Sequence, residues 1–164
     1  MARTWIKHSL ACLFCLAMIA GCSSKTNEAF TKEQTETAIK DDAEEKIVYK
    51  IRISFDDQEM IAEFEDNITS RALIDQMPFT ISMMNLYGRE MCYRFGRDSL
   101  PIEGANDSTY SVGDISIWPP AGSLVILYKQ NGEIFEQQYL GHTDDDLSIF
   151  EGLPDADMTF ELIE

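Results

Sequence analysis

The sequence predicts a mainly β domain that follows an N-terminal segment of quite different composition. Two apolar runs rich in β-branched residues flank a Pro-Pro-Ala-Gly turn at residues 119–122, and such runs are typical of core strands. Residues 47–55 alternate apolar and polar side chains, which is the period of a strand buried on one face. The region that follows carries turn residues between short apolar runs and shows no internal repeat, so we expect a single β domain.

The first 21 residues form a separate unit. Arg3 and Lys7 precede an apolar run over residues 10–20, the arrangement of a secretory signal, and this run is too short to span a membrane. It ends in Ile-Ala-Gly before Cys22, which resembles the lipobox of bacterial lipoproteins. The resemblance implies cleavage before Cys22 and lipid on its sulfur; the competing interpretation is an ordinary signal peptide. Two or more acyl chains, at ~0.8 kcal/mol per buried CH₂, give stable anchoring.

Composition then divides the remainder of the chain. Residues 23–46 are almost entirely polar, too poor in apolar surface to offset the entropy of folding, and at Ile47 the composition changes abruptly. We therefore expect a signal peptide over 1–21, a lipidated cysteine and flexible tether over 22–46, and a folded domain over 47–164. The expected location is the bacterial cell envelope, with the domain lipid-anchored to a membrane outside the cytoplasm.

Charge and cysteine content limit the partners and the chemistry. Removal of 21 of the 164 residues leaves 11 basic and 29 acidic residues, a formal charge of −18, which argues against nucleic acid as a partner. The same charge repels anionic headgroups, so the lipid on Cys22 must supply the contact with the membrane. Only Cys92 remains beside Cys22, so stability must come from a hydrophobic core rather than from a disulfide within the domain.

Periodicity and turn residues predict the elements in chain order. Asn67 is placed to cap the first helix, and the Met77-Pro78 step is expected to end it, because the residue before proline disfavours helical backbone. Residues 87–112 carry several glycines and a proline and are predicted to be a long loop with short extended pieces such as 91–95. The predicted strands cover residues 47–55, 59–65, 79–86, 113–118, 123–128, 134–140 and 158–163, and the predicted helices cover 69–77 and 143–150.

Several segments resemble the bacterial cyclophilin-like family. The resemblance is carried by Gly-Asp-Ile at 113–115, Trp-Pro-Pro at 118–120, the aliphatic run at 124–128 and the closing segment 157–164, and it covers about residues 47–164. It implies a closed eight-stranded β-barrel with two short capping helices, which leaves no exposed sheet edge. These motifs are core strands and turns, so they indicate the fold rather than the chemistry.

Cyclophilins that catalyse prolyl isomerisation carry Phe-His-Arg on the catalytic strand, a Ser-Gln-Phe-Phe segment and a loop tryptophan. The corresponding region here is Cys92-Tyr93-Arg94-Phe95, where Arg94 is the one residue that could replace the arginine. At the second motif, residues 123–126 are Ser-Leu-Val-Ile, with aliphatic side chains in place of glutamine and the aromatics. The resemblance therefore implies the fold and leaves isomerase activity as the alternative function.

Other reactive residues have simpler interpretations. A Cys92–His142 nucleophile pair is conceivable, but a lone cysteine among Met91, Tyr93 and Phe95 is more often a small buried hydrophobe. The run Asp144-Asp145-Asp146 lacks the alternating ligands of a calcium loop and is better suited to capping a helix. We expect neither a metal nor a cofactor.

Aromatic residues of the long loop and the proline turn are the candidate ligand-binding set. Tyrosine and tryptophan combine apolar area with a polar group, as binding surfaces require, and Arg94 adds a charge. Trp118 falls on the serine face of its strand beside a rigid turn, so we expect its indole over the mouth of the barrel. The candidate ligand-binding residues are Tyr87, Tyr93, Arg94, Tyr110 and Trp118. With Phe95, the same aromatics are equally suited to plug one end of the barrel.

The sequence thus favours a membrane-anchored lipoprotein whose domain is a non-catalytic binding module for an extended peptide or a small molecule. A divergent peptidyl-prolyl isomerase is the alternative, and a structural or assembly subunit without a small ligand is a third possibility.

Overall fold

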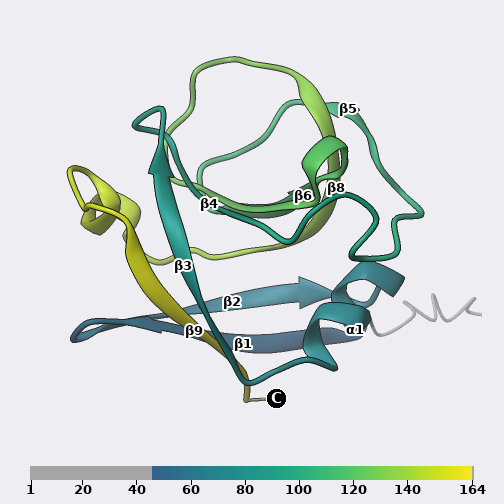
Figure 1. Ribbon diagram of the computed structural model, residues 1–164, viewed down its shortest axis with the longest axis horizontal. Coiled ribbons are helices and arrows are strands. Elements are labelled where there is room, and N and C mark those ends of the chain that lie inside the picture. Colours follow the sequence, from purple (N-terminus) through teal and green to yellow (C-terminus); the bar gives the residue numbers. More distant parts are fainter. Residues whose placement is uncertain (1–45, 164) are drawn as a thin grey trace, which may run out of the picture. The chain divides into compact units, whose positions relative to one another are not determined.

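The computed structural model describes residues 46–163, which form a closed antiparallel β-barrel (Figure 1). Eight strands follow one another around the barrel in the order β2-β1-β9-β3-β4-β7-β6-β8, and a pairing between β2 and β8 closes the ring. A short ninth strand, β5, pairs with β8. The elements are β1 (Val48–Phe55), β2 (Gln58–Glu65), α1 (Ile68–Ile74), β3 (Phe79–Leu86), β4 (Glu90–Arg94), β5 (Asn106–Ser108), β6 (Asp114–Trp118), the 3₁₀ turn η1 (Pro119–Ala121), β7 (Ser123–Leu127), β8 (Phe135–His142), the 3₁₀ turn η2 (Leu147–Phe150) and β9 (Ala156–Leu162).

The predicted fold class is confirmed, with one change at the second helix. The helix predicted over 143–150 is only the 3₁₀ turn η2 over residues 147–150, and Asp146, the last residue of the predicted capping run, is its cap. Thr143 is instead buried beyond β8, and its hydroxyl donates to the Ile61 carbonyl oxygen at 2.8 Å. Figure 1 shows α1 and η2 at opposite sides of the barrel.

The first helix begins where the sequence predicts. Asn67 caps α1, and its side-chain oxygen accepts from the Ser70 amide at 2.9 Å. The helix ends at Ile74, three residues earlier than predicted. Pro78 lies between the helix and β3 and directly precedes the first residue of that strand. No helix within residues 46–163 has the length and hydropathy needed to cross a membrane.

Side chains on the two faces of the barrel wall form two separate apolar clusters. The inward-facing residues of β7 and β4, such as Leu124, Ile126 and Met91, belong to the main core. The intervening residues Cys92 and Val125 point outward and join a smaller cluster on the outer face of the wall. Because β7 is buried on both faces, its sequence is apolar without alternation.

One part of the predicted loop is a barrel strand. Residues 90–94 form β4, which pairs with β3 on one side and with β7 on the other. Gly88 and Gly96 lie on either side of this segment, and in the sequence alone they favour a loop. In the structure both glycines have positive φ and belong to the turns at the two ends of β4. The extended piece predicted within residues 87–112 is therefore present. The prediction was wrong in treating it as part of a loop, because it is a strand of the barrel wall with a partner on each side.

Candidate functional site

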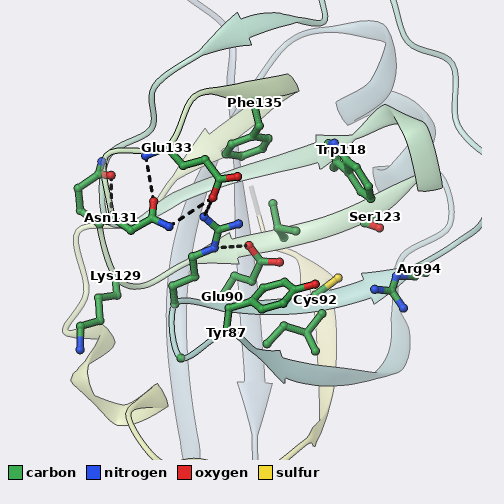
Figure 2. Close-up of a pocket in the computed structure, with 15 residues that line it drawn as sticks. Tyr87, Glu90, Cys92, Arg94, Trp118, Ser123, Lys129, Asn131, Glu133 and Phe135 are labelled. Atoms are coloured by element: carbon green, nitrogen blue, oxygen red, sulfur yellow. Dashed lines mark hydrogen bonds and ion pairs between the residues drawn. The ribbon is translucent and has the colours of Figure 1, made fainter.

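A pocket of about 720 Å³ lies on the outer face of the barrel wall (Figure 2). This volume is within the range of roughly 300–1,000 Å³ in which proteins hold small molecules. Its apolar surface comes from the ends of β3 and β8 and from the outward-facing sides of β4, β6 and β7. The residues that supply it are Leu86, Cys92, Trp118, Val125 and Phe135.

Strand register explains why three of the lining residues form a row. Arg94 on β4 pairs with Ser123 on β7, and Ser123 pairs in turn with Trp118 on β6. Residues paired across antiparallel strands lie on the same face of the sheet. The row therefore crosses the end of the pocket beside the proline turn, and Figure 2 shows the three side chains at this end.

The polar groups of this row are not satisfied within the described part of the chain. The Arg94 side chain is exposed and has neither a hydrogen bond nor an ion pair within residues 46–163. Ser123 is 1% exposed, and among these residues its hydroxyl has only the Cys92 thiol, a weak hydrogen-bonding group, as a polar neighbour. Trp118 is 38% exposed beside them. The Arg94 guanidinium and the Trp118 indole are therefore accessible to a bound molecule, and the Ser123 hydroxyl is buried between them in the row.

The other end of the pocket is built around an internally paired arginine. The Arg89 guanidinium lies 3.3 Å from a carboxylate oxygen of Glu90 and donates from Nη1 to Glu133. Its guanidinium carbon also lies 5.6 Å from the centre of the Tyr87 ring, a cation–π distance. Burial opposes the charged form of Arg89 more than any single contact favours it, but the hydrogen bond to Glu133 and the charges of Glu90 and Glu133 together outweigh burial, so the pKa of Arg89 is raised.

Burial also changes the chemistry of two residues in the pocket floor. It raises the pKa of the Glu90 carboxyl, although the charge of Arg89 partly offsets the effect. It likewise raises the pKa of the Cys92 thiol, which is the opposite of what a nucleophilic cysteine requires. Cys92 is therefore an apolar contact in this pocket and not a candidate nucleophile.

Backbone conformation holds the β3–β4 turn against the pocket. Tyr87 and Gly88 both have positive φ angles, of 57° and 61°, and the Arg89 amide donates to the Leu86 carbonyl oxygen at 3.2 Å. Positive φ is uncommon for a residue with a Cβ, so Tyr87 is held there by its surroundings. The Tyr87 ring is 77% exposed and forms part of the rim.

The structure brings three of the five predicted ligand-binding residues to the pocket: Tyr87, Arg94 and Trp118. The Trp118 indole lies on the outer wall, not over the mouth of the barrel as expected. Tyr93 does not line the pocket, because it lies on the inward side of β4. Its ring meets that of Phe95 edge-on at 4.9 Å, and both pack against the main core.

Tyr110 lies behind the pocket and supports it. The residue is buried in the outer cluster, and its ring lies 5.8 Å from that of Phe135. Its hydroxyl donates to the Lys129 carbonyl oxygen at 2.9 Å and accepts from the Asn131 amide at 3.2 Å. Tyr110 therefore holds the segment between β7 and β8, which supplies one side of the pocket.

Apart from Arg94, the sequence did not reveal the charged and hydroxyl groups of the pocket. Glu90 and Arg94 share a face with Cys92 by the period of a strand, a signal that was present but obscured by reading 87–112 as a loop. Nothing local marks Ser123, Lys129 or Glu133, because they reach the pocket only through the pairing of distant strands. The missed lining residues are Leu86, Gly88, Arg89, Glu90, Cys92, Ser123, Val125, Lys129, Gln130, Asn131, Glu133 and Phe135.

The remaining reactive residues lie elsewhere. His142 does not line the pocket with Cys92; its Nδ1 lies 2.9 Å from a carboxylate oxygen of Asp114. The Asp146 side chain accepts from the Ser148 amide at 2.9 Å, which confirms capping as its role and lowers its pKa. Within residues 46–163 no three His, Cys, Asp or Glu side chains are grouped as a metal site would require.

Comparison with known proteins identifies the family. The model of the cyclophilin-like family matches residues 53–162, about two thirds of the chain. The chain belongs to the cyclophilin-like family. This membership agrees with the closed barrel of the structure.

A solved structure supports the cyclophilin-like fold independently. It is the solution structure of a hypothetical protein from Archaeoglobus fulgidus, with a TM-score of 0.55 and 17% identity over 74% of this chain and 99% of that one. At this identity the likeness concerns the fold alone. No curated protein matches the chain.

Proposed function

We propose that this cyclophilin-like protein is a membrane-anchored lipoprotein of the bacterial envelope and that its barrel is a non-catalytic binding module. The outer-wall pocket is the binding site in this proposal, and its ligand is a small molecule or an extended peptide. The single observation that carries the proposal is the combination, in one pocket, of an apolar floor with the unpaired Arg94 guanidinium and the buried Ser123 hydroxyl.

Pockets that bind ligands combine a mostly apolar lining with a few polar groups that fix orientation. A buried hydroxyl without a strong partner costs free energy, and a ligand that accepts from it offsets this cost. The anchoring part of the proposal depends on the lipobox at Cys22, which lies outside the described residues.

A binding screen tests the proposed site. Purified protein is screened against short peptides and small molecules, and each hit is repeated with Trp118→Ala. We expect hits that bind the wild type and lose at least about tenfold in affinity with Trp118→Ala, because the indole is a large contact surface that is still accessible. Hits that bind both proteins equally well would place the binding site elsewhere.

A divergent prolyl isomerase remains the second candidate, and one observation favours it. Arg94, the residue that could replace the catalytic arginine, lies in the pocket in the same cross-strand row as Trp118. Catalysis also requires a donor directed at the proline amide nitrogen and an apolar recess for the ring. The aliphatic residues Leu124 and Ile126 face the main core, so they cannot replace the missing aromatics in the pocket.

We therefore expect no catalysed isomerisation of a standard proline-containing peptide. A protease-coupled isomerisation assay measures it directly, with the uncatalysed rate as baseline. Turnover that is abolished by Arg94→Ala and retained by Arg97→Ala would replace the binding proposal with the enzymatic one.

A further inference from the structure

We propose that the pocket binds a small organic monocarboxylate. The acid group lies at the row formed by Arg94, Ser123 and Trp118, and an apolar or aromatic body lies over Cys92 and Val125. The inference rests on the proposed binding function and deepens it by naming the chemical class of the ligand.

The two arginines of the pocket differ in how many contacts they make with other side chains. Arg89 is engaged by Glu90, Glu133 and the Tyr87 ring. Arg94 has no hydrogen bond or ion pair with any other described residue. A guanidinium presents two parallel donors that match the two oxygens of a carboxylate, which makes it the preferred residue for such a ligand.

Ser123 supplies the second donor. Its hydroxyl is buried, and its one polar neighbour within residues 46–163 is the Cys92 thiol, a weak hydrogen-bonding group. Strand pairing places it between Arg94 and Trp118. Leaving a buried hydroxyl without a partner costs free energy, and a ligand that accepts from it removes this cost. A carboxylate accepts hydrogen bonds only, so it satisfies the serine and the arginine together.

Charge in the pocket favours one negative group on the ligand rather than two. The chain is strongly acidic, yet three of the eight Lys and Arg residues between 46 and 163 line this pocket: Arg89, Arg94 and Lys129. Glu90 and Glu133 are also present and offset part of this charge. A single carboxylate matches the remaining excess of positive charge in the pocket. A phosphate dianion carries more negative charge and is repelled by the two glutamates.

The body of the ligand is apolar because the pocket floor is apolar. Cys92 and Val125 form its base, and Trp118 and Phe135 add aromatic surface at its sides. The pocket volume of about 720 Å³ accommodates one drug-sized molecule.

Calorimetric titration of the full chain in mild detergent tests the inference. The probes are benzoate and naphthalene-2-carboxylate, each paired with its uncharged carboxamide, and phenyl phosphate. We expect at least one acid to bind about tenfold or more tightly than its amide, since hydrogen bonds to a charged group are worth roughly that factor. Phenyl phosphate should bind more weakly than benzoate. An amide that binds as tightly as its acid, or a phosphate that binds more tightly than benzoate, would overturn the inference.

Variants locate the acid group. Arg94→Gln should lose the preference for acid over amide, and Ser123→Ala should weaken binding of the acid several-fold without loss of thermal stability. Arg97→Gln is the matched control, because Arg97 is an exposed arginine three residues away that does not line the pocket. Loss of binding by Arg97→Gln equal to that of Arg94→Gln would mean that net charge alone attracts the probe.

The two proposals fail in different ways. If acids and amides bind equally and Trp118→Ala weakens both, the pocket is a binding site and only the carboxylate assignment is wrong. If no probe binds, or if binding is unaffected by Trp118→Ala, the assignment of the pocket as the binding site fails as well.

Discussion

Trp118 lies on β6, a strand with one face in the barrel core and the other on the outer wall. Ile115 and Ile117 are fully buried in the barrel core, whereas Trp118, on the other face, is 38% exposed above the pocket. The alternation of a single strand therefore separates a residue that stabilises the fold from one that is available to a ligand.

This difference predicts a modest stability cost for Trp118→Ala. The loss in unfolding free energy should be clearly below the about 3–5 kcal/mol typical of removing a fully buried large aromatic. Phe64→Ala is the matched control, because Phe64 is fully buried, and it should show the full loss. Urea unfolding followed by circular dichroism compares them. Equal losses for the two variants would show that the indole is part of the core.

The buried carboxyl of Glu90 should make the free energy of unfolding depend on pH. Burial raises its pKa in the folded protein above the ordinary value of 4.5, so folding favours the protonated carboxyl. The stability contributed by this group is present below pH 4.5 and is lost as pH rises through the raised pKa. Glutamine does not ionise, so Glu90→Gln should gain stability relative to the wild type as pH rises from 4.5 to 7.

Urea unfolding at several pH values between 4 and 7 measures this difference. Glu136→Gln, at an exposed position of β8, is the control for removing a carboxylate as such. A difference between Glu90→Gln and the wild type that is constant, or that falls with rising pH, would show that pairing with Arg89 outweighs burial.

At the scale of an element, the turn between β6 and β7 positions both Trp118 and Ser123. Pro119 and Pro120 start the 3₁₀ turn, and Gly122 ends it with a left-handed backbone at φ 56°. The Gly122 carbonyl oxygen accepts from the Phe95 amide at 3.0 Å, which ties this turn to the end of β4. The turn therefore sets the spacing of the row that crosses the pocket.

Gly122→Ala should be far more destabilising than Gly132→Ala. Both glycines have positive φ, which costs an alanine about 1–2 kcal/mol. At Gly122 an added Cβ would also lie 1.9 Å from the Gly96 carbonyl oxygen, whereas at Gly132 it would meet nothing within 4 Å. Thermal unfolding of the two variants measures the difference. Similar losses would show that Gly96 can move away without cost.

At the scale of the whole molecule, closure of the barrel depends on the contact between β2 and β8. Within residues 46–163 only Glu63–His142 and Phe64–Gly141 are paired there, fewer than at any other junction of the ring, the next fewest being the three pairs of β3 with β4. Gly141 allows the two backbones to approach closely, since an added Cβ would lie 2.0 Å from the Glu63 carbonyl oxygen.

Gly141→Ala should therefore open this junction. We expect a loss of roughly 3 kcal/mol or more, in the upper range for single substitutions, with faster hydrogen exchange at the β2 and β8 amides. Gly104→Ala is the control, because its nearest neighbour would be the Gln138 side chain at 3.3 Å. Unchanged protection of β2 and β8 in Gly141→Ala would contradict the closure argument.

The proposed location of the whole molecule at a membrane depends on Cys22. Metabolic labelling with a fatty acid should mark the wild type and leave Cys22→Ala unlabelled, because the lipid has no other predicted attachment site. Cys15→Ala, within the predicted signal, should retain the label. Label on Cys22→Ala would end the lipoprotein assignment.

Local patterning was enough to determine most elements of this protein. Residues 79–86 form a strand with the predicted bounds, and Asn67 caps α1, because side-chain alternation and capping act over a few neighbouring residues. The sequence also placed Trp118 on the serine face of its strand. Family motifs at 113–128 then indicated the closed barrel.

Only the tertiary structure decided which residues form the pocket. Arg94 and Ser123 are 29 positions apart, and they become neighbours because β4 and β7 pair in one particular register. The same pairing directs Tyr93 into the core and Cys92 outward, so it divides the predicted aromatic set between two faces of the wall. Periodicity within one strand shows that it has two faces, but which face meets the core and what covers the other depend on strands that are distant in sequence.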